Sequence, residues 1–201
     1  MIDITRELSE GHPVWPGDSA YALEQVSSID QGSAVNVLRL TTSTHLGTHV
    51  DAPWHYAAGG GRLVSVGLDL LVGEALVIDA RGDGPVPATV LPDEPLPPRV
   101  LLYTGQPERW LAFPTFRALA PDLVMALGRR GVRLVGTDAP SVDPVDSKDL
   151  PAHEACFRAG ITIVEGLELS QATPGRYRLV CLPLRMPHAD ASPVRAVLEP
   201  L

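Results

Sequence analysis

Cysteine is scarce in this chain of 201 residues, which contains two, Cys156 and Cys181. They lie in unlike surroundings and form no CxxC pattern, so two reduced thiols are the simplest account of them. Residues 1–7 carry acidic side chains where a signal peptide carries basic ones and an apolar core. These features lead us to expect a cytoplasmic location.

Long apolar runs and an excess of positive charge are missing as well. No stretch approaches the ~18 apolar residues that a membrane span requires. The formal net charge is −8, which disfavours nucleic acid or an anionic membrane as the main partner. The chain is 45% hydrophobic and 20% charged, as soluble globular proteins are. One domain over residues 1–201 accommodates this length, and a small molecule is the expected partner.

Strand and helix signals alternate along the chain and predict an α/β fold. Strands are predicted at 2–8, 21–29, 34–42, 74–80, 99–104, 132–137 and 161–164, with 30–33 joining the second and third as a hairpin-like connection. Helices are predicted at 116–119, at 121–130, and from about 151 to Gly160, with Ser147 or Asp149 as the cap of the last one. The proline-rich stretch 81–98 indicates a surface excursion.

Histidine is infrequent but concentrated, since three of the six histidines lie in the segment 44–56. Four polar side chains of this segment occupy odd positions, namely His45, His49, Asp51 and His55. An extended chain would point all four to one side. Gly47 would lie on the same side and leave room for metal ions. Because Pro53 disfavours a helical conformation in the residue before it, we place the segment at the end of a strand or on the loop that follows.

Imidazole and carboxylate groups at this density indicate a metal site rather than ordinary polar loop residues. Such ligands suit zinc and, more loosely, manganese, iron or cobalt. His153 falls in the first turn of a predicted helix, where the positive end of the helix dipole keeps its imidazole neutral and available as a ligand. Glu165 follows the apolar strand 161–164, where a carboxylate needs a partner. That partner could be a metal ion or an arginine, and the sequence leaves both open.

Other chemistries receive little support. The glycine-rich segment 57–62 lacks the Lys-Ser/Thr pair of a phosphate loop, so we expect a flap beside the site. Ser43, Ser141 and Ser192 are not part of a GxSxG nucleophile elbow. Trp15, beside a Pro-Gly turn, could be a core residue or the wall of a pocket.

The segment from His45 to His55 resembles the HxGxHxDxPxH signature of the metal-dependent cyclase family of hydrolases. Further matches run nearly from end to end and point to the kynurenine formamidase branch; they are 15–18, 141–144, 146–148, 150–153, 163–167 and 189–196. The resemblance implies a single-domain mixed β-sheet with flanking helices, of the swivelling β/α/β type, that usually forms a homodimer. The least familiar stretch is 185–188, and neither His188 nor the segment 81–98 has an expected role.

The resemblance also implies a site with two zinc ions per subunit, with manganese, cobalt or iron as alternatives. The implied ligands are His45, His49 and Asp51 for one ion and His153 for the other, with Asp51 and Glu165 shared between them. His55 matches the proton donor and acceptor of the family. Trp15 matches its substrate-contacting aromatic residue, and Trp54 and Tyr56 are lesser candidates for that role.

The implied reaction is the hydrolysis of N-formyl-L-kynurenine to L-kynurenine and formate, the arylformamidase step of tryptophan degradation in the kynurenine pathway. Water would be activated by the two zinc ions. One alternative is a hydrolase of the same family that acts on another aryl or cyclic amide. A third hypothesis is a metal-binding protein without turnover, but His55 is additional to a sufficient set of ligands and argues against it.

Overall fold

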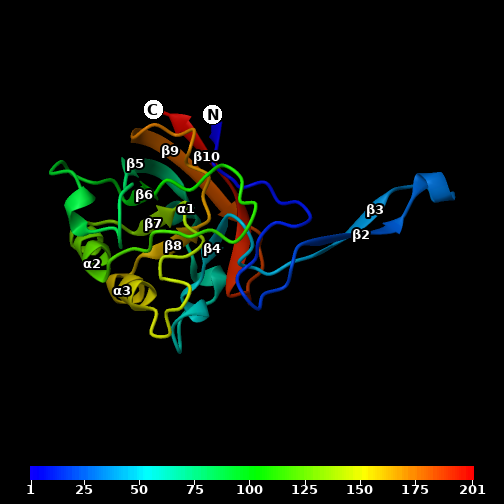
Figure 1. The fold of residues 1–201 in the computed structure, drawn as a ribbon, viewed down its shortest axis with the longest axis horizontal. Coiled ribbons are helices and arrows are strands. Elements are labelled where there is room, and N and C mark those ends of the chain that lie inside the picture. The colour runs from blue at the N-terminus through cyan, green and yellow to red at the C-terminus, as the bar shows by residue number, and fades with distance from the viewer.

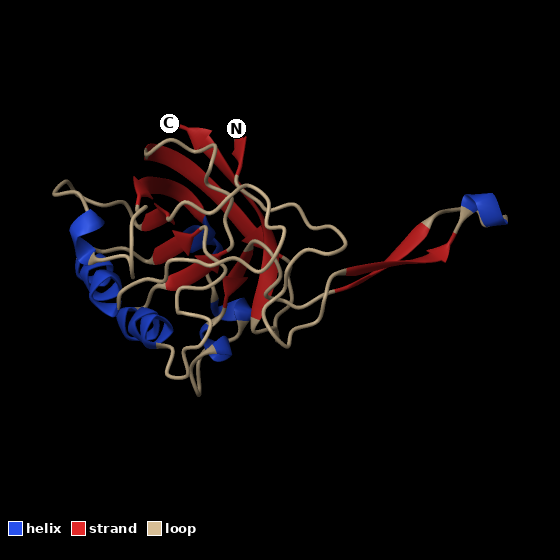
Figure 2. Cartoon of the chain, viewed as in Figure 1, coloured by secondary structure: helices blue, strands red, loops and turns tan.

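Most of the strands close into a barrel. The computed structural model describes all 201 residues, and its main sheet has eight strands in the order β1-β10-β4-β8-β7-β6-β5-β9. Because β9 also pairs with β10, seven strands form a closed ring, and β1 is added beside β10. Figures 1 and 2 show this ring, with both chain ends lying close together at one side of it. Closure leaves few unpaired strand edges.

The barrel mixes parallel and antiparallel pairs. Its strands are β1 (Ile2–Asp3), β4 (His49–Asp51), β5 (Val72–Asp79), β6 (Arg99–Tyr103), β7 (Leu134–Thr137), β8 (Thr162–Glu165), β9 (Gly175–Pro183) and β10 (Ala191–Pro200). The neighbours β5, β6, β7 and β8 pair in parallel, and the remaining pairs are antiparallel. The mixed sheet that the family resemblance implied is therefore present.

Helices are few, and the two longer ones lie together on one side of the barrel (Figure 2). They are α1 (Leu68–Leu71), α2 (Pro121–Arg129) and α3 (Pro151–Ala159), and single 3-10 turns occur at η1 (Ile29–Gln31), η2 (Pro53–His55), η3 (Leu63–Ser65) and η4 (Ala88–Val90). None of them combines the length and apolar character that crossing a membrane requires.

Two apolar clusters lie on opposite faces of the sheet. Side chains alternate between the two faces of a strand, so Ala75 and Val77 of β5 join the cluster inside the barrel. Leu76 and Ile78 of the same strand join the outer cluster, which contains buried side chains of α2 and α3. The outer face near α3 is the one that carries the site described below.

A two-stranded arm leaves the barrel (Figure 1). It consists of β2 (Ala22–Ser27) and β3 (Val37–Thr41), paired antiparallel, so the predicted hairpin is confirmed. Every residue of β3 is exposed. Leu38 and Leu40 are each 56% exposed, because the arm packs on nothing else in this chain.

Several predicted elements differ from the structure. The helix predicted at 116–119 is wrong, because the segment is extended there and Leu119 forms a parallel bridge with Val86. The strand predicted at 2–8 ends at Asp3, whose carboxylate accepts a hydrogen bond from the Thr5 amide. The segment 81–98 is a largely exposed connection between β5 and β6, as predicted. The long strands β9 and β10 were not predicted.

Candidate metal centre

The histidine-rich segment lies where β4 meets β8. These strands pair antiparallel, and His49 lies directly opposite Glu165. Val50 and Val164 point into the barrel and belong to its inner cluster. Their neighbours therefore point to the outer face. Two stretches far apart in the sequence thus bring imidazole and carboxylate groups to one place.

Helix α3 adds His153 to the same place. The carboxylate of Asp143 accepts hydrogen bonds from the amides of Ala152 and His153, both at 2.9 Å, and so caps the helix. The predicted caps were wrong: the Ser147 hydroxyl accepts from the residue before the helix, and Asp149 is exposed. A buried acid from the preceding loop supplies the cap because the turn at 144–150 folds back over the start of the helix.

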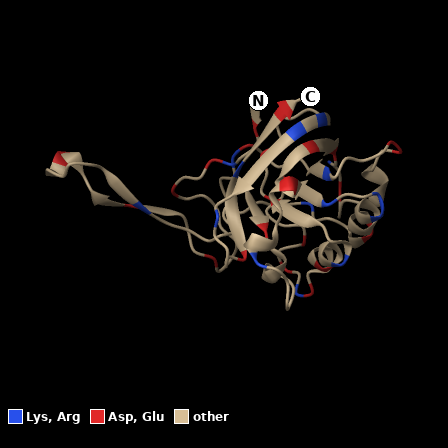
Figure 3. Cartoon of the chain, turned by 180° about the vertical axis from the view of Figure 1, so that it is seen from behind, with Lys and Arg blue, Asp and Glu red and all other residues tan.

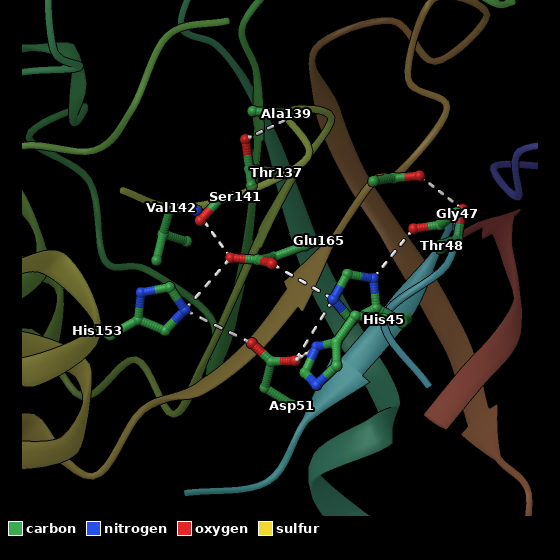
Figure 4. A network of polar contacts seen from close by, with 12 residues as sticks. His45, Gly47, Thr48, Asp51, Thr137, Ala139, Ser141, Val142, His153 and Glu165 are labelled. Carbon is green, nitrogen blue, oxygen red and sulfur yellow. Dashed lines mark hydrogen bonds and ion pairs between the residues drawn. The ribbon is translucent and has the colours of Figure 1, made fainter. Parts of the chain in front are cut away.

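Five side chains with ligand atoms converge here, namely His45, His49, Asp51, His153 and Glu165. Figure 4 labels four of them, His45, Asp51, His153 and Glu165. The Asp51 carboxylate is central: Oδ1 lies 3.1 Å from His45 Nδ1 and 3.4 Å from His49 Nε2. Its Oδ2 lies 3.7 Å from His153 Nε2. Asp51 therefore faces all three imidazoles at once.

Glu165 closes the cluster from the opposite side. Its Oε2 lies 3.3 Å from His49 Nε2, and its Oε1 lies 3.6 Å from His153 Nε2. Oε1 also accepts a hydrogen bond from the Val142 amide at 2.7 Å. No arginine forms an ion pair with Glu165, so the arginine partner left open by the sequence is excluded.

Each of the three clustered histidines directs its other ring nitrogen towards an acceptor. His45 Nε2 lies 3.3 Å from Asp190 Oδ2, and His49 Nδ1 lies 3.0 Å from the carbonyl oxygen of Gly47. His153 Nδ1 lies 2.8 Å from Asp143 Oδ2. A hydrogen on each outer nitrogen leaves the inner lone pair facing the centre, which is the usual arrangement around metal-ligating histidines.

The carboxylates at the centre of the cluster favour a positive charge there. Burial opposes protonation of His49, but its contacts with Asp51 and Glu165 outweigh burial and raise its pKa to about 10. The pKa of His153 is likewise raised to about 10 against the effect of burial, by Asp143 and Asp51. Burial would raise the pKa of Asp51, yet the surrounding imidazoles hold it well below its usual value. Two buried carboxylates therefore stabilise whatever cation occupies this position.

The polar atoms of the cluster fit a divalent metal. Both oxygens of Asp51 and the Nε2 atoms of His49 and His153 are buried and make no hydrogen bond. Ligand atoms of His45, His49 and Asp51 lie within 4.8 Å of one another. A second group of this kind joins Asp51 with His55 and His153. These imidazole nitrogens and carboxylate oxygens, which have no hydrogen-bond partner, are ligands of the kind that zinc prefers.

His55 stands beside the cluster on η2, a turn that begins with Pro53. Its ring centroid lies 3.9 Å from that of His45 and 6.0 Å from that of His153. Desolvation lowers the pKa of His55, despite the nearby carboxylate of Asp51. A neutral imidazole with this placement can accept a proton from a group held at the cluster.

A cavity of about 420 Å³ opens over these groups. Its wall includes Trp15, Trp110 and Phe113, together with His45 and His55. Trp15 therefore lines a pocket, and its ring meets that of Phe113 edge-on at 5.5 Å between centroids and 84° between planes. An apolar ring next to metal-ligand chemistry can hold an aromatic substrate.

The two lesser aromatic candidates do not line this cavity. Trp54 is exposed and stacks beneath the Arg62 guanidinium, 3.6 Å from its ring centroid. Tyr56 packs against His153 with ring centroids 5.0 Å apart. Neither side chain lines the cavity, and a role for either of them in contacting the substrate stays a prediction.

Gly47 has a different role from the one predicted. Its φ of +62° is left-handed, and a β-carbon there would lie 2.5 Å from Leu8 Cδ2. The left-handed turn therefore favours the glycine, and a β-carbon there would point towards Leu8 and His12 rather than towards the ligand atoms. Gly166 is its counterpart in the facing turn, where a β-carbon would lie 2.2 Å from the Gly47 carbonyl oxygen.

Three residues that the sequence did not single out belong to the site. Asp143 and Asp190 orient histidines, and both fall within motifs that carried the family resemblance. Phe113 lines the cavity. Its signal was the concentration of three aromatic residues within positions 110–116.

Comparisons with known proteins agree with this geometry. The Cyclase family matches residues 2–144. A kynurenine formamidase of Erythrobacter litoralis (strain HTCC2594) is 43% identical over 206 residues, which cover 99% of this chain and 93% of that protein. A solved structure described as a potential metal-dependent hydrolase with cyclase activity has a TM-score of 0.82 and 29% identity, covering 98% of this chain and 95% of that one.

A further solved structure shares the fold alone. It is an isatin hydrolase bound to the product analogue thioisatinate, with a TM-score of 0.83 at 20% identity, covering 100% of this chain and 92% of that one. The family resemblance and the fold class expected from the sequence are confirmed. The chain belongs to the Cyclase family.

Proposed function

We propose that this protein is an arylformamidase that hydrolyses N-formyl-L-kynurenine to L-kynurenine and formate, in tryptophan degradation through the kynurenine pathway. The observation that carries the proposal is the set of unpartnered ligand atoms around Asp51, facing an aromatic-walled cavity. The 43% identity to a kynurenine formamidase supports the choice of substrate. The cavity volume falls in the range of small-molecule sites.

The donor set is consistent with two zinc ions per subunit, and manganese, cobalt or iron would be held by the same groups. His45, His49 and Asp51 would hold one ion and His153 the other, with Asp51 and Glu165 shared. Divalent ions bound there would make water more acidic and polarise the formyl carbonyl, which addresses the two obstacles to amide hydrolysis near neutral pH.

The side chains of this chain would then handle protons and position the substrate. His55 accepts a proton from the attacking water as the new carbon–oxygen bond forms, and donates it to the aryl amine as the carbon–nitrogen bond breaks. Positioned acid–base groups of this kind contribute about 10²–10⁴-fold. Trp15 supplies an apolar face for the aryl ring of the substrate.

A second candidate is a hydrolase that acts on another aryl or cyclic amide. The aromatic wall favours it to the same degree, because Trp15 and Phe113 would accept any flat ring next to the cluster. A metal-binding protein without turnover is the weakest candidate, since it would have no use for His55 beside a complete set of ligands.

The test combines metal content with turnover. Elemental analysis of the purified protein should find two equivalents of divalent metal, and the protein should release formate from N-formyl-L-kynurenine. Chelation should abolish the activity and added zinc should restore it. Parallel assays with other aryl amides and with a cyclic amide distinguish the two hydrolase candidates. Full activity in the metal-free protein would reject the proposed mechanism.

We further propose that the enzyme is a cytoplasmic homodimer. The β2–β3 arm exposes apolar side chains such as Leu38 and Leu40, and its strands carry few charges (Figure 3). An isolated two-stranded hairpin is marginally stable in water, so a second copy of the chain is the expected cover for it. The free thiols of Cys156 and Cys181 agree with a reducing compartment.

A further inference from the structure

The cavity has an aromatic wall built by one irregular segment, residues 104–117, here called the wall segment. It carries Trp110 and Phe113, which line the cavity, and Phe116 behind them. Phe116 lies 6.5 Å from Trp15 and 6.4 Å from Phe113 between ring centroids. The three rings of Trp15, Phe113 and Phe116 therefore support one another.

The start of the wall segment is fastened to the barrel by a single carboxylate. Asp138, at the end of β7, accepts hydrogen bonds from the Thr104 amide and hydroxyl at 2.7 and 2.6 Å. It also accepts from the amides of Gly105 at 3.0 Å and Gln106 at 2.7 Å. The side chain of Gln106 donates to the carbonyl oxygen of Thr115 at 3.1 Å, which draws the two ends of the segment together.

A buried arginine holds the middle of the wall segment. Arg6 is 3% exposed and donates to the carbonyl oxygens of Pro107 at 2.7 Å and Glu108 at 3.1 Å. Its guanidinium also lies over the Trp110 ring, 3.9 Å from the centroid. The ring of Phe113 is thus carried on an anchored loop, although the loop has no regular secondary structure.

We propose that Phe113 is a substrate-contacting residue that makes the site selective for an aromatic ring on the amide nitrogen. The planes of Phe113 and Trp15 meet at 84° and form a corner. An aryl ring in this corner can stack on one of the two rings and meet the other edge-on, and both are favourable arrangements of aromatic pairs. A saturated ring of similar size gains only the apolar burial.

This inference rests on the proposed function for its substrate and goes beyond it in assigning the ring selectivity to Phe113. An aromatic pair contributes about 2- to 12-fold in affinity beyond its buried area. A purely structural role for Phe113 predicts something else: loss of its ring would affect aromatic and saturated ligands equally.

The experiment uses the metal-loaded enzyme and the variants Phe113→Leu and Phe113→Ala. Phe157→Ala is the matched control, since Phe157 is 46% exposed on α3 and does not line the cavity. Steady-state kinetics with N-formyl-L-kynurenine gives kcat and KM. Calorimetry with acetophenone and with its saturated counterpart, cyclohexyl methyl ketone, measures the preference for an aromatic ring without turnover.

We expect Phe113→Leu to raise KM about 2- to 12-fold with kcat within twofold, and to lose the preference for the aromatic ketone by the same factor. Phe113→Ala should show the same loss, and Phe157→Ala should match the wild type. Equal weakening of both ketones, or a wild-type enzyme without any aromatic preference, would overturn the inference. A wild-type enzyme that leaves N-formyl-L-kynurenine intact but shows a Phe113-dependent preference would reject the proposed substrate alone.

Discussion

Replacement of Asp143 by asparagine should weaken the binding of metal by His153, although Asp143 is not itself a proposed ligand. The side chain is 1% exposed, and Oδ2 accepts hydrogen bonds from both the amide and Nδ1 of His153. Oδ1 accepts from the Ala152 amide. An asparagine has one carbonyl oxygen, so its amino group must face at least one of these buried donors.

The two orientations of the asparagine have different costs. With its amino group towards Ala152, a buried N–H loses its acceptor, which costs about 1–3 kcal/mol. With its amino group towards His153, the imidazole can accept only if its proton moves to Nε2, the nitrogen that faces Asp51 and Glu165. A protonated Nε2 cannot bind a metal ion. Loss of such supporting partners typically weakens metal binding 10–100-fold, or about 1.4–2.8 kcal/mol.

Zinc titration calorimetry on chelated protein measures the loss of metal affinity, and thermal unfolding of the metal-free protein measures the cost of the lost hydrogen bond. Asp143→Asn should lower the affinity of one zinc equivalent about 10–100-fold. Its Tm should fall about 2–12 °C, at 2–4 °C per kcal/mol for a protein of this size. Asp149→Asn is the control, because Asp149 is exposed on the same loop. Wild-type zinc affinity in Asp143→Asn would refute the orienting role and leave Asp143 as a helix cap.

Three further changes test other parts of the structure. His55→Ala should lower turnover about 10²–10⁴-fold with an unchanged metal content, and loss of metal would instead identify His55 as a ligand. Gly166→Ala should lower the free energy of unfolding by several kcal/mol in urea titrations, about 1–3 kcal/mol more than the control Gly160→Ala. Both glycines have a φ of +64°, but a β-carbon would contact backbone atoms only at Gly166. Replacement of Leu38 and Leu40 by serine should shift the sedimentation coefficient from dimer to monomer, and an unchanged coefficient would remove the arm from the proposed interface.

Local signals in the sequence predicted the elements with clear ends. Helix α3 ends at Gly160 in the left-handed region, and α2 begins at Pro121, both as predicted. The hairpin arm was also predicted from its two strands and short connection. In each case the signal lies within a few residues of the structure that it specifies.

The strands that close the barrel were missed for an identifiable reason. Pro193 lies inside β10, and a proline within an apolar run argues against a central strand. Here β10 pairs with β4 at Pro193, and its pairing with β9 begins only at Val194. Pro193 therefore has a neighbouring strand on one side only, and its missing N–H removes no hydrogen bond to β9. In β9, the alternation of buried Tyr177 and Leu179 with exposed residues was an available signal.

The candidate site shows the same division between local and long-range information. His49 and Asp51 lie on one face of β4, as their odd positions in an extended chain predicted. His45 reaches the cluster from the preceding turn and His55 from η2. The alternation of side chains along a strand therefore does not explain the positions of these two histidines. Asp143 could not be predicted as the cap of α3, because its contact depends on how the loop at 144–150 folds.

The position of the cluster at the seam of the barrel connects the fold to the chemistry. β4 has three residues and is the shortest strand of the ring, yet it alone joins β10 to β8. Only Val50 contributes to the inner cluster, so β4 has little apolar surface with which to hold the ring closed. His49 and Asp51 take the other two places and contact β8 and α3 through Glu165 and His153. Metal ions bound by these side chains would link β4 to β8 and α3, where the ring has the least apolar contact. Metal binding and closure of the barrel should therefore stabilise each other.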